Sequence, residues 1–282
     1  MSGTDMPRDV AAQASDRSTL IVALHDVWDS LDHVLARLTP VQWALPTCLP
    51  EWTVSDVIAH VIGTECMLAG DPVPAVALDV SSLPHVANDI GAVNEIWVQA
   101  LRAAPGAEML RLFRNVVSRR REALECTTQA DFDARSWTPA GEATYARFMQ
   151  LRVYDTWMHE QDVRAATGIA GHCRGPAATV SLAELCRALG YIVGKRAALP
   201  DGTSVRFDLA GALPARIDVM VEGRAEIVQL DRTPTVTLRM PSELLMWLSG
   251  GRSSASEHSS DIEIRGDRFL GLRVLDHLAF TI

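Results

Sequence analysis

The sequence lacks several features that would place it in other classes of protein. No run of about 18 apolar residues occurs, so no segment is predicted to cross a membrane. The first seventeen residues are polar and small and lack the apolar segment of a signal peptide. Residues 1–17 are therefore predicted to form a disordered tail, and we expect a soluble protein of the cytoplasm.

Cysteine is scarce, and no excess of positive charge is present. The five cysteines are widely spaced and form no Cys-x-x-Cys pair, which argues against a disulfide framework and a zinc knuckle. The net charge of −9 argues against nucleic acid or an anionic membrane surface as a partner. The glycine-rich nucleotide-binding motifs, the Gly-x-Ser-x-Gly motif and the His-Glu-x-x-His motif are also missing.

The residues that are present indicate a helical first half. The chain has 282 residues, 48% of them hydrophobic, which suits two domains of about 100–200 residues each. In the first half, apolar residues recur at steps of three and four. That period predicts helices over 18–38, 53–70, 88–103, 107–125 and 144–167, with a loop between the last two.

The periodicity changes near residues 171–175. One more helix is predicted over 177–198, and then apolar residues alternate with polar ones at 205–209, 217–221, 236–240 and 262–264, which is typical of strands. Helices are predicted over 242–248 and 269–278. The predicted fold is therefore an all-α bundle over 18–172, followed by a smaller α+β domain over 173–282 with a mostly antiparallel sheet.

Three residues form a candidate metal site. Asp155 and His159 are four residues apart, so their side chains lie on one face of a helix, about one turn from each other. His60 lies on the apolar side of an earlier helix, between Val57 and Val61, and should face the interior of the bundle. Helical bundles commonly build metal sites from facing helices. Three protein ligands leave a further position open for water or substrate.

Simpler interpretations of these residues also stand. His60 could be a hydrogen-bonded core histidine, and Asp155 with His159 could be a surface ion pair. Asp162 could form a salt bridge with Arg164, or it could orient a ligand histidine. The spacing alone does not choose between these interpretations.

The other histidines give weaker signals. His25 lies at the edge of the first apolar stripe, where it could line the same cavity or simply mark the boundary of the helix. His85, His172, His258 and His277 lie in loops or in the second domain, without partners at metal-ligand spacing.

Three stretches of the chain carry a resemblance to a known family. They are LTPVQWALPTCLPEWTVSDVIAHVIGTE at 38–65, RVYDTWMHEQDVRAATG at 152–168, and LLMWLSGGRSS followed by DIEIRGDRFLGLRVLDHL near the C-terminus. With them the sequence resembles the mycothiol-dependent maleylpyruvate isomerase family, part of the wider DinB-like superfamily. The resemblance implies a DinB-like four-helix bundle and a small sterol-carrier-like C-terminal domain.

The resemblance also implies a metal and a thiol. It implies a divalent metal, most often zinc, held by two histidines and a carboxylate, which correspond to His60, Asp155 and His159. Two departures stand out: family members often have Glu in place of Asp155, and Pro-Gly where this chain has Pro50-Glu51. Mycothiol is the implied cosubstrate, in an actinobacterial cell, and its metal-bound thiolate would attack a small electrophile.

The leading functional prediction is a metal- and mycothiol-dependent isomerase or S-transferase. In an isomerase the thiol adds and leaves again, whereas in a transferase it stays attached to the electrophile. Two histidines and a carboxylate also describe non-haem iron sites. A bundle whose metal is structural or lost would be a non-catalytic module that binds small molecules. The expected partners are small molecules rather than nucleic acid or membrane, and the expected state is a monomer or homodimer.

Overall fold

The computed structural model describes residues 16–139 and 141–281, which form two compact units, Asp16–His172 and a second unit that begins at Cys173. Most of the predicted tail, residues 1–15, lies outside the described residues. Asp16 and Arg17 belong to the first helix, because the Asp16 carboxylate accepts a hydrogen bond from the Thr19 amide and so caps it. The helix thus begins within the last two residues of the predicted tail.

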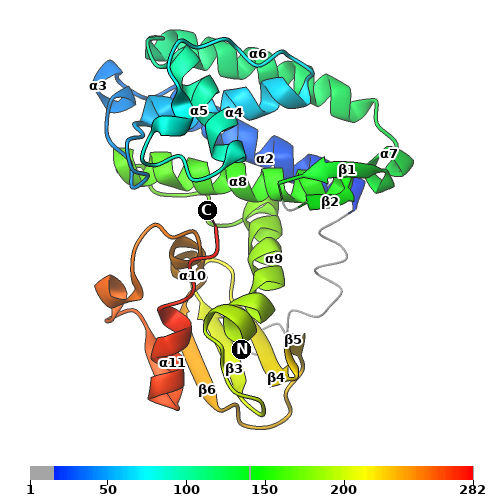
Figure 1. The fold of residues 1–282 in the computed structure, drawn as a ribbon, viewed down its shortest axis with the longest axis vertical. Coiled ribbons are helices and arrows are strands. Elements are labelled where there is room, and N and C mark those ends of the chain that lie inside the picture. The colour runs from blue at the N-terminus through cyan, green and yellow to red at the C-terminus, as the bar shows by residue number, and fades with distance from the viewer. Residues whose placement is uncertain (1–15, 140, 282) are drawn as a thin grey trace. The chain divides into compact units, whose positions relative to one another are not determined.

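Four long helices build the first unit (Figure 1), and they are α2 (Arg17–Leu35), α4 (Val54–Leu68), α6 (Gly106–Glu125) and α8 (Tyr145–Thr167). Helices α2 and α4 each pack against both α6 and α8, which confirms the predicted four-helix bundle. Helix α5 (Asp89–Leu101) packs on α4. Gly63 permits that approach, since a Cβ there would lie 2.3 Å from Cγ of Trp97.

Side-chain caps fix the ends of the helices that carry the site. Thr53 forms a capping box with Asp56 at the start of α4, and the Thr144 hydroxyl accepts from an amide in the first turn of α8. Asn88 caps α5 in the same way. Gly168, at a φ of 71°, ends α8 in the left-handed conformation that glycine adopts readily. The three caps lie at or next to the predicted helix starts.

The connecting segments contain short elements that the sequence period did not indicate. Helix α2 ends at Leu35, before its predicted end at 38. The segment predicted as a loop before α8 contains a short helix and a hairpin, whose strands are mostly polar and so carry no apolar alternation. The short elements are α3 (Pro40–Trp43), η1 (Val80–Ser82), α7 (Gln129–Asp133), β1 (Arg135–Thr138) and β2 (Gly141–Thr144).

Charged residues lie among the apolar core residues of the bundle. The core of α2 and α4 is aliphatic and aromatic, with Leu24, Trp28 and Ile58 fully buried. Titratable side chains are buried beside them, and these are Asp56, His60 and Glu65 on α4 and Arg152, His159, Glu160 and Asp162 on α8. Charges are costly to bury unless they are paired or bind a metal. The facing sides of α4 and α8 are therefore the place to look for a site.

A five-stranded sheet forms the second unit, with the strand order β5-β4-β3-β6-β7. Every neighbouring pair is antiparallel except β3 with β6, which is parallel. The prediction of a mostly antiparallel sheet is confirmed, although β5 was not predicted. The strands are β3 (Ser204–Ala210), β4 (Ala215–Glu222), β5 (Arg224–Val228), β6 (Val236–Pro241) and β7 (Glu263–Gly266).

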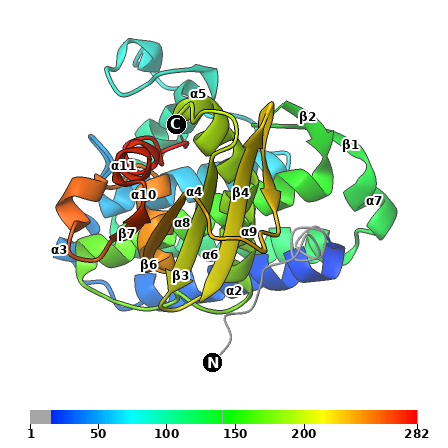
Figure 2. The same cartoon turned by 90° about the horizontal axis from the view of Figure 1, so that it is seen from below.

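Three helices pack on the apolar face of this sheet. Helix α9 (Pro176–Tyr191) continues as the π-helical turn η2 (Ile192–Arg196) and contacts β4 and β5. Helices α10 (Ser242–Ser249) and α11 (Arg268–Leu275) contact β6, with the short η3 (Ala255–His258) between them in sequence. Figure 2 looks onto the strands of this sheet. The inward residues of the central strand β3 are Val205, Phe207 and Leu209, all buried.

One helix in the described chain, Pro176–Arg196, is long and apolar enough to cross a membrane by length and composition. Sequence inspection predicted no such segment, because polar residues interrupt it. Its best window has a hydropathy of 1.2, and 67% of that window is buried inside the structure. The core helix of a folded domain passes the same test.

Candidate metal centre

Two helices bring three metal-ligating side chains together. His60 lies on α4, and Asp155 and His159 lie one turn apart on α8. One ligand atom from each residue lies within 4.8 Å of the other two. The Nε2 atom of His60 is 3.3 Å from Oδ2 of Asp155, and the Nε2 atom of His159 is 3.6 Å from Oδ1. The three residues singled out in the sequence therefore surround one point.

These separations suit the ligands of a single tetrahedral ion. With metal–ligand bonds of about 2.0–2.2 Å, two ligand atoms on a tetrahedron lie about 3.3–3.6 Å apart. The two nitrogen–oxygen separations, 3.3 and 3.6 Å, fall in that range, and they end on the two different oxygens of the Asp155 carboxylate. The longer one exceeds the length of an ordinary hydrogen bond. The donor set therefore fits a divalent metal, with His60, Asp155 and His159 as the residues that could hold it.

The site has one closed side and one open side. His60 and His159 are only 4% and 8% exposed, whereas 36% of the Asp155 side chain is exposed. The ring of Trp52 lies next to both imidazoles, with its centroid 5.5 Å from that of His60 and 6.3 Å from that of His159. A small molecule can therefore approach the group beside Asp155, while the aromatic ring helps to close the imidazole side.

The protonation of the three residues favours metal binding unequally. Burial lowers the pKa of His60 more than Asp155 raises it, so this imidazole is neutral at neutral pH. Burial opposes the charge on Asp155, but Arg152 and the two imidazoles hold the pKa of its carboxyl well below the usual range. Burial also opposes the charge on His159, yet Asp155 and Asp162 raise its pKa overall. A metal must therefore displace a proton from His159 below that pKa.

Asp162 fixes the orientation of His159. Its buried Oδ2 atom lies 3.0 Å from Nδ1 of His159, so Nε2 is left facing Asp155. The other oxygen accepts a hydrogen bond from the thiol of Cys48 at 3.2 Å. Arg164 forms its salt bridge with Glu160, 2.7 Å away. The contact with His159 matches the second sequence interpretation of Asp162, that of a carboxylate that orients a ligand histidine.

A chain of buried charges supports Asp155 from behind. Glu65 on α4 accepts hydrogen bonds from Arg120 on α6 and Arg152 on α8, each at 3.0 Å. These three side chains are at most 4% exposed. Arg152 reaches onward to Oδ2 of Asp155 at 2.5 Å and to Thr156 at 3.1 Å. The carboxylate of Asp155 is thus tied to two other helices of the bundle.

A second buried carboxylate holds the aromatic ring beside the imidazoles. Glu95 on α5 is fully buried and accepts a hydrogen bond from the indole Nε1 of Trp52 at 3.0 Å. The same carboxylate contacts His85 at 3.1 Å and Gln99 at 2.7 Å. Trp52 also follows Glu51, whose φ of 65° lies in the left-handed region where glycine is favoured. The position of Trp52 therefore depends on a helix that does not carry any of the three ligands.

Sequence reasoning missed most of these supporting contacts. Glu65 and Glu95 gave no signal, because neither lies at helical spacing from a candidate ligand. His172, predicted to lack a partner, lies between Glu160 at 2.6 Å and Asp26 at 3.1 Å. His25 packs beside Trp28, with ring centroids 6.0 Å apart, and is not part of the three-residue group.

Comparison with known proteins connects this geometry to a family. The sequence profile of the mycothiol maleylpyruvate isomerase N-terminal domain matches residues 24–164. The chain belongs to this family. Two uncharacterized proteins, from two strains of Mycobacterium tuberculosis, are each 27% identical to it over 157 residues. The match spans 55% of this chain but only 59% of each relative.

Solved structures with the family name share the fold of this chain. The crystal structure of the mycothiol-dependent maleylpyruvate isomerase superposes with a TM-score of 0.56 at 15% identity, and a histidine-to-alanine mutant of that enzyme with 0.57 at 16%. Each match covers 88% of this chain and 92% of the other. The predicted fold class is thereby confirmed. All three candidate ligands lie within the segment that matches the mycothiol maleylpyruvate isomerase N-terminal domain.

Proposed function

We propose that this protein is a metal-dependent isomerase or S-transferase that uses mycothiol, with His60, Asp155 and His159 as the metal ligands. The observation that carries the proposal is the convergence of two imidazole nitrogens and a carboxylate oxygen within 4.8 Å. Zinc is the expected ion, since two nitrogens and one oxygen with an open fourth position are typical of catalytic zinc sites. Membership of the mycothiol maleylpyruvate isomerase family supports the choice of thiol.

The residues around the site have separable roles in this proposal. When bound, the metal supplies positive charge that lowers the pKa of a thiol at its open position. Asp162 holds the Nδ1 proton of His159, so that Nε2 presents its lone pair to the ion. Arg152 orients the carboxylate of Asp155. Trp52 shields both imidazoles from water.

The exposed side of the site, at Asp155, indicates where the substrates would enter. A low-molecular-weight thiol and a small electrophile would enter there, and the thiolate would be the nucleophile. We place the protein in the cytoplasm, where thiols stay reduced, in keeping with its five free cysteines. Its net charge of −9 supports small-molecule partners over nucleic acid or an anionic membrane, acting as a monomer or homodimer.

The first test is the metal content of purified protein by elemental analysis. We expect about one zinc per chain in the wild type and its loss in His159→Ala, because three-ligand binding needs every ligand. His33→Ala is a matched control, because His33 is exposed on α2. Mycothiol should raise the melting temperature of the wild type and the control only. Equal metal content in all three proteins would overturn the ligand assignment.

A thiol balance then separates the two reaction types. Protein, mycothiol and maleylpyruvate are incubated together, and free thiol is measured with the product. An isomerase returns all of the thiol, whereas a transferase consumes one thiol for each product formed. No thiol-dependent product from maleylpyruvate or from a reactive haloalkane would count against the enzyme proposal.

The same ligands favour a second candidate function. Two histidines and one carboxylate with open positions also form non-haem iron sites that activate oxygen. Bound iron, with a product that forms only in the presence of oxygen, would replace the zinc proposal with this one. Zinc in the protein and an oxygen-independent product would exclude it.

A further inference from the structure

The outward face of the sheet in the second unit carries charges in an alternating pattern. Cross-strand pairing places Asp218, Arg206, Thr237 and Arg265 in one row, and Arg216, Asp208, Arg239 and Glu263 in the next. Acidic and basic side chains alternate along and across both rows, with one exception. Thr237 is neutral at the position where the pattern calls for a carboxylate, between Arg206 and Arg265.

The missing carboxylate leaves these two rows with one more positive charge than negative charge. Arg206 pairs with Asp218 at 2.6 Å, and Arg265 pairs with Glu263 at 2.7 Å. A looser pair, at 3.8 Å, joins Arg239 and Asp208. The fourth arginine of the two rows, Arg216, has no salt-bridge partner within the described part of the chain. The gap at Thr237 therefore lies in a field that favours an anion.

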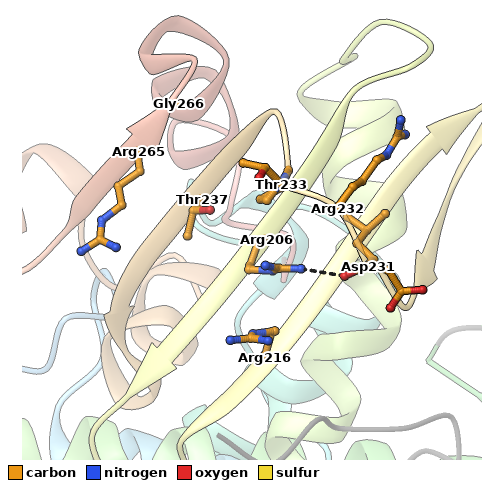
Figure 3. Close-up of a pocket in the computed structure, with 10 residues that line it drawn as sticks. Arg206, Arg216, Asp231, Arg232, Thr233, Thr237, Arg265 and Gly266 are labelled. Atoms are coloured by element: carbon orange, nitrogen blue, oxygen red, sulfur yellow. Dashed lines mark hydrogen bonds between the residues drawn. The ribbon is translucent and has the colours of Figure 1, made fainter. Parts of the chain in front are cut away.

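A groove of about 530 Å³ lies over this gap (Figure 3). Its volume is within the range of about 300–1,000 Å³ that small-molecule sites occupy. Its lining contains four arginines and one aspartate, although the whole chain has a net charge of −9. Arg206, Arg216, Thr237 and Arg265 form its floor, and residues 230–234, between β5 and β6, form one wall.

Hydrogen bonds hold that wall on the sheet. Arg206 donates to the Leu230 carbonyl at 3.1 Å, the contact drawn in Figure 3, and the Leu230 amide donates to Asp218 at 3.3 Å. Farther along the wall, the guanidinium of Arg232 reaches the sulfur of Met220 at 3.6 Å. The groove is therefore preformed, which lowers the ordering cost of binding a ligand.

Two hydroxyl groups in the groove remain available. Within the described residues, the side chains of Thr233 and Thr237 make no hydrogen bond, so each hydroxyl can donate to a ligand. Neighbouring strands lie about 4.8 Å apart, so one oxyanion above Thr237 is within reach of arginines on both flanking strands. Guanidinium groups recognise oxyanions through paired N–H donors.

We propose that this groove binds the phosphate group of a small molecule, with the phosphate above Thr237 between Arg206 and Arg265. A phosphate monoester supplies the negative charge that the pattern lacks. It also offers three terminal oxygens, enough for both flanking guanidinium groups and the hydroxyl at once, whereas a carboxylate offers two. Arg216, which has no salt-bridge partner among the described residues, adds a further positive charge on the floor.

Calorimetric titration of the full-length protein tests this proposal. The probes are inorganic phosphate and glycerol 3-phosphate, each at constant ionic strength set with chloride. We expect saturable binding in the wild type, a loss of about fivefold in Arg216→Gln, and a loss of at least about tenfold in Thr237→Asp. The aspartate completes the charge pattern, so Thr237→Asp should melt at or above the wild-type temperature, which separates lost binding from lost folding.

Arg224→Gln is the matched control, because Arg224 is exposed on β5 and lies outside the groove. It removes the same charge and should bind phosphate as the wild type does. Tighter binding of the ester than of inorganic phosphate would identify an esterified ligand, and equal binding would identify free phosphate. No saturable binding of either probe, or an equal loss in Arg224→Gln and Arg216→Gln, would overturn the proposal.

Discussion

The buried ion network behind the candidate metal centre should contribute more to the stability of the bundle than surface ion pairs do. Arg120 and Arg152 are at most 4% exposed in the wild type, and in Glu65→Ala both lose the carboxylate that they share. Removing one partner of a buried pair typically costs about 3–5 kcal/mol, because it leaves an uncompensated charge in the core. Arg152 keeps Asp155 as a partner, whereas Arg120 keeps only neutral contacts to Tyr145 and Met149. We therefore expect a loss of about 3–5 kcal/mol.

Urea unfolding followed by tryptophan fluorescence measures this loss. Six of the seven tryptophans lie within Asp16–His172, so the signal reports mainly on the helical unit. With an m-value of about 2 kcal/mol per M, the midpoint should fall by about 1.5–2.5 M. Glu108→Ala is the control, since Glu108 forms an exposed pair with Arg111 on α6 and should cost at most about 1 kcal/mol.

The test compares the loss of unfolding free energy in Glu65→Ala with the loss in Glu108→Ala. Both replace a helical glutamate by alanine, so the small gain in helix propensity is the same and cancels. A loss in Glu65→Ala no larger than that in Glu108→Ala would refute the reasoning. It would mean that the two guanidinium groups find water or other partners once the carboxylate is gone.

Three further changes test separate features. In Asp162→Asn, metal affinity should fall about 10–100-fold in chelator competition, because His159 loses its charged acceptor; unchanged affinity would contradict that role. Although burial opposes it, two carboxylate partners raise the pKa of His172 above its ordinary value of 6.5. Its stabilisation is therefore complete below that value and is lost as pH rises through the folded-state pKa. Urea titrations should show this loss in the wild type but not in His172→Gln, and parallel profiles would speak against it. Glu51→Gly should raise the free energy of unfolding by about 0.5–1 kcal/mol, since relief of left-handed strain exceeds the added freedom of the unfolded chain; a thermal melt without any gain would exclude strain at this residue.

The parts of the fold that depend on local sequence could be predicted. Apolar residues at steps of three and four located α2 and α4, and Thr53 was recognisable as a cap at the start of α4. The predicted starts at 88 and 144 coincide with Asn88 and Thr144, whose side chains cap α5 and α8. Strand β5 was missed because it is a short edge strand with exposed or half-buried residues throughout. The parallel pairing of β3 with β6 is a non-local property that no window of sequence contains.

The residues of the candidate site also differ in how far the local sequence could predict them. Asp155 and His159 are related by one helical turn, so their proximity is local information. His60 comes from another helix, and only its place on the apolar face pointed to the interior. Glu65 and Glu95 could not be found, since their importance depends on packing between helices. A charged residue within an apolar stripe nevertheless indicates a buried polar contact, because a buried charge requires a partner.

Arg152 affects how the bundle folds when no metal is bound. Its guanidinium lies 2.5 Å from the Asp155 carboxylate and already provides a positive neighbour. Small zinc modules unfold when the ion is removed, because nothing else balances their ligands. Here the polypeptide carries its own counter-charge, so folding need not wait for the ion. If the proposed site binds a metal, the bundle can fold before the ion arrives and can keep its fold when the ion is lost or exchanged.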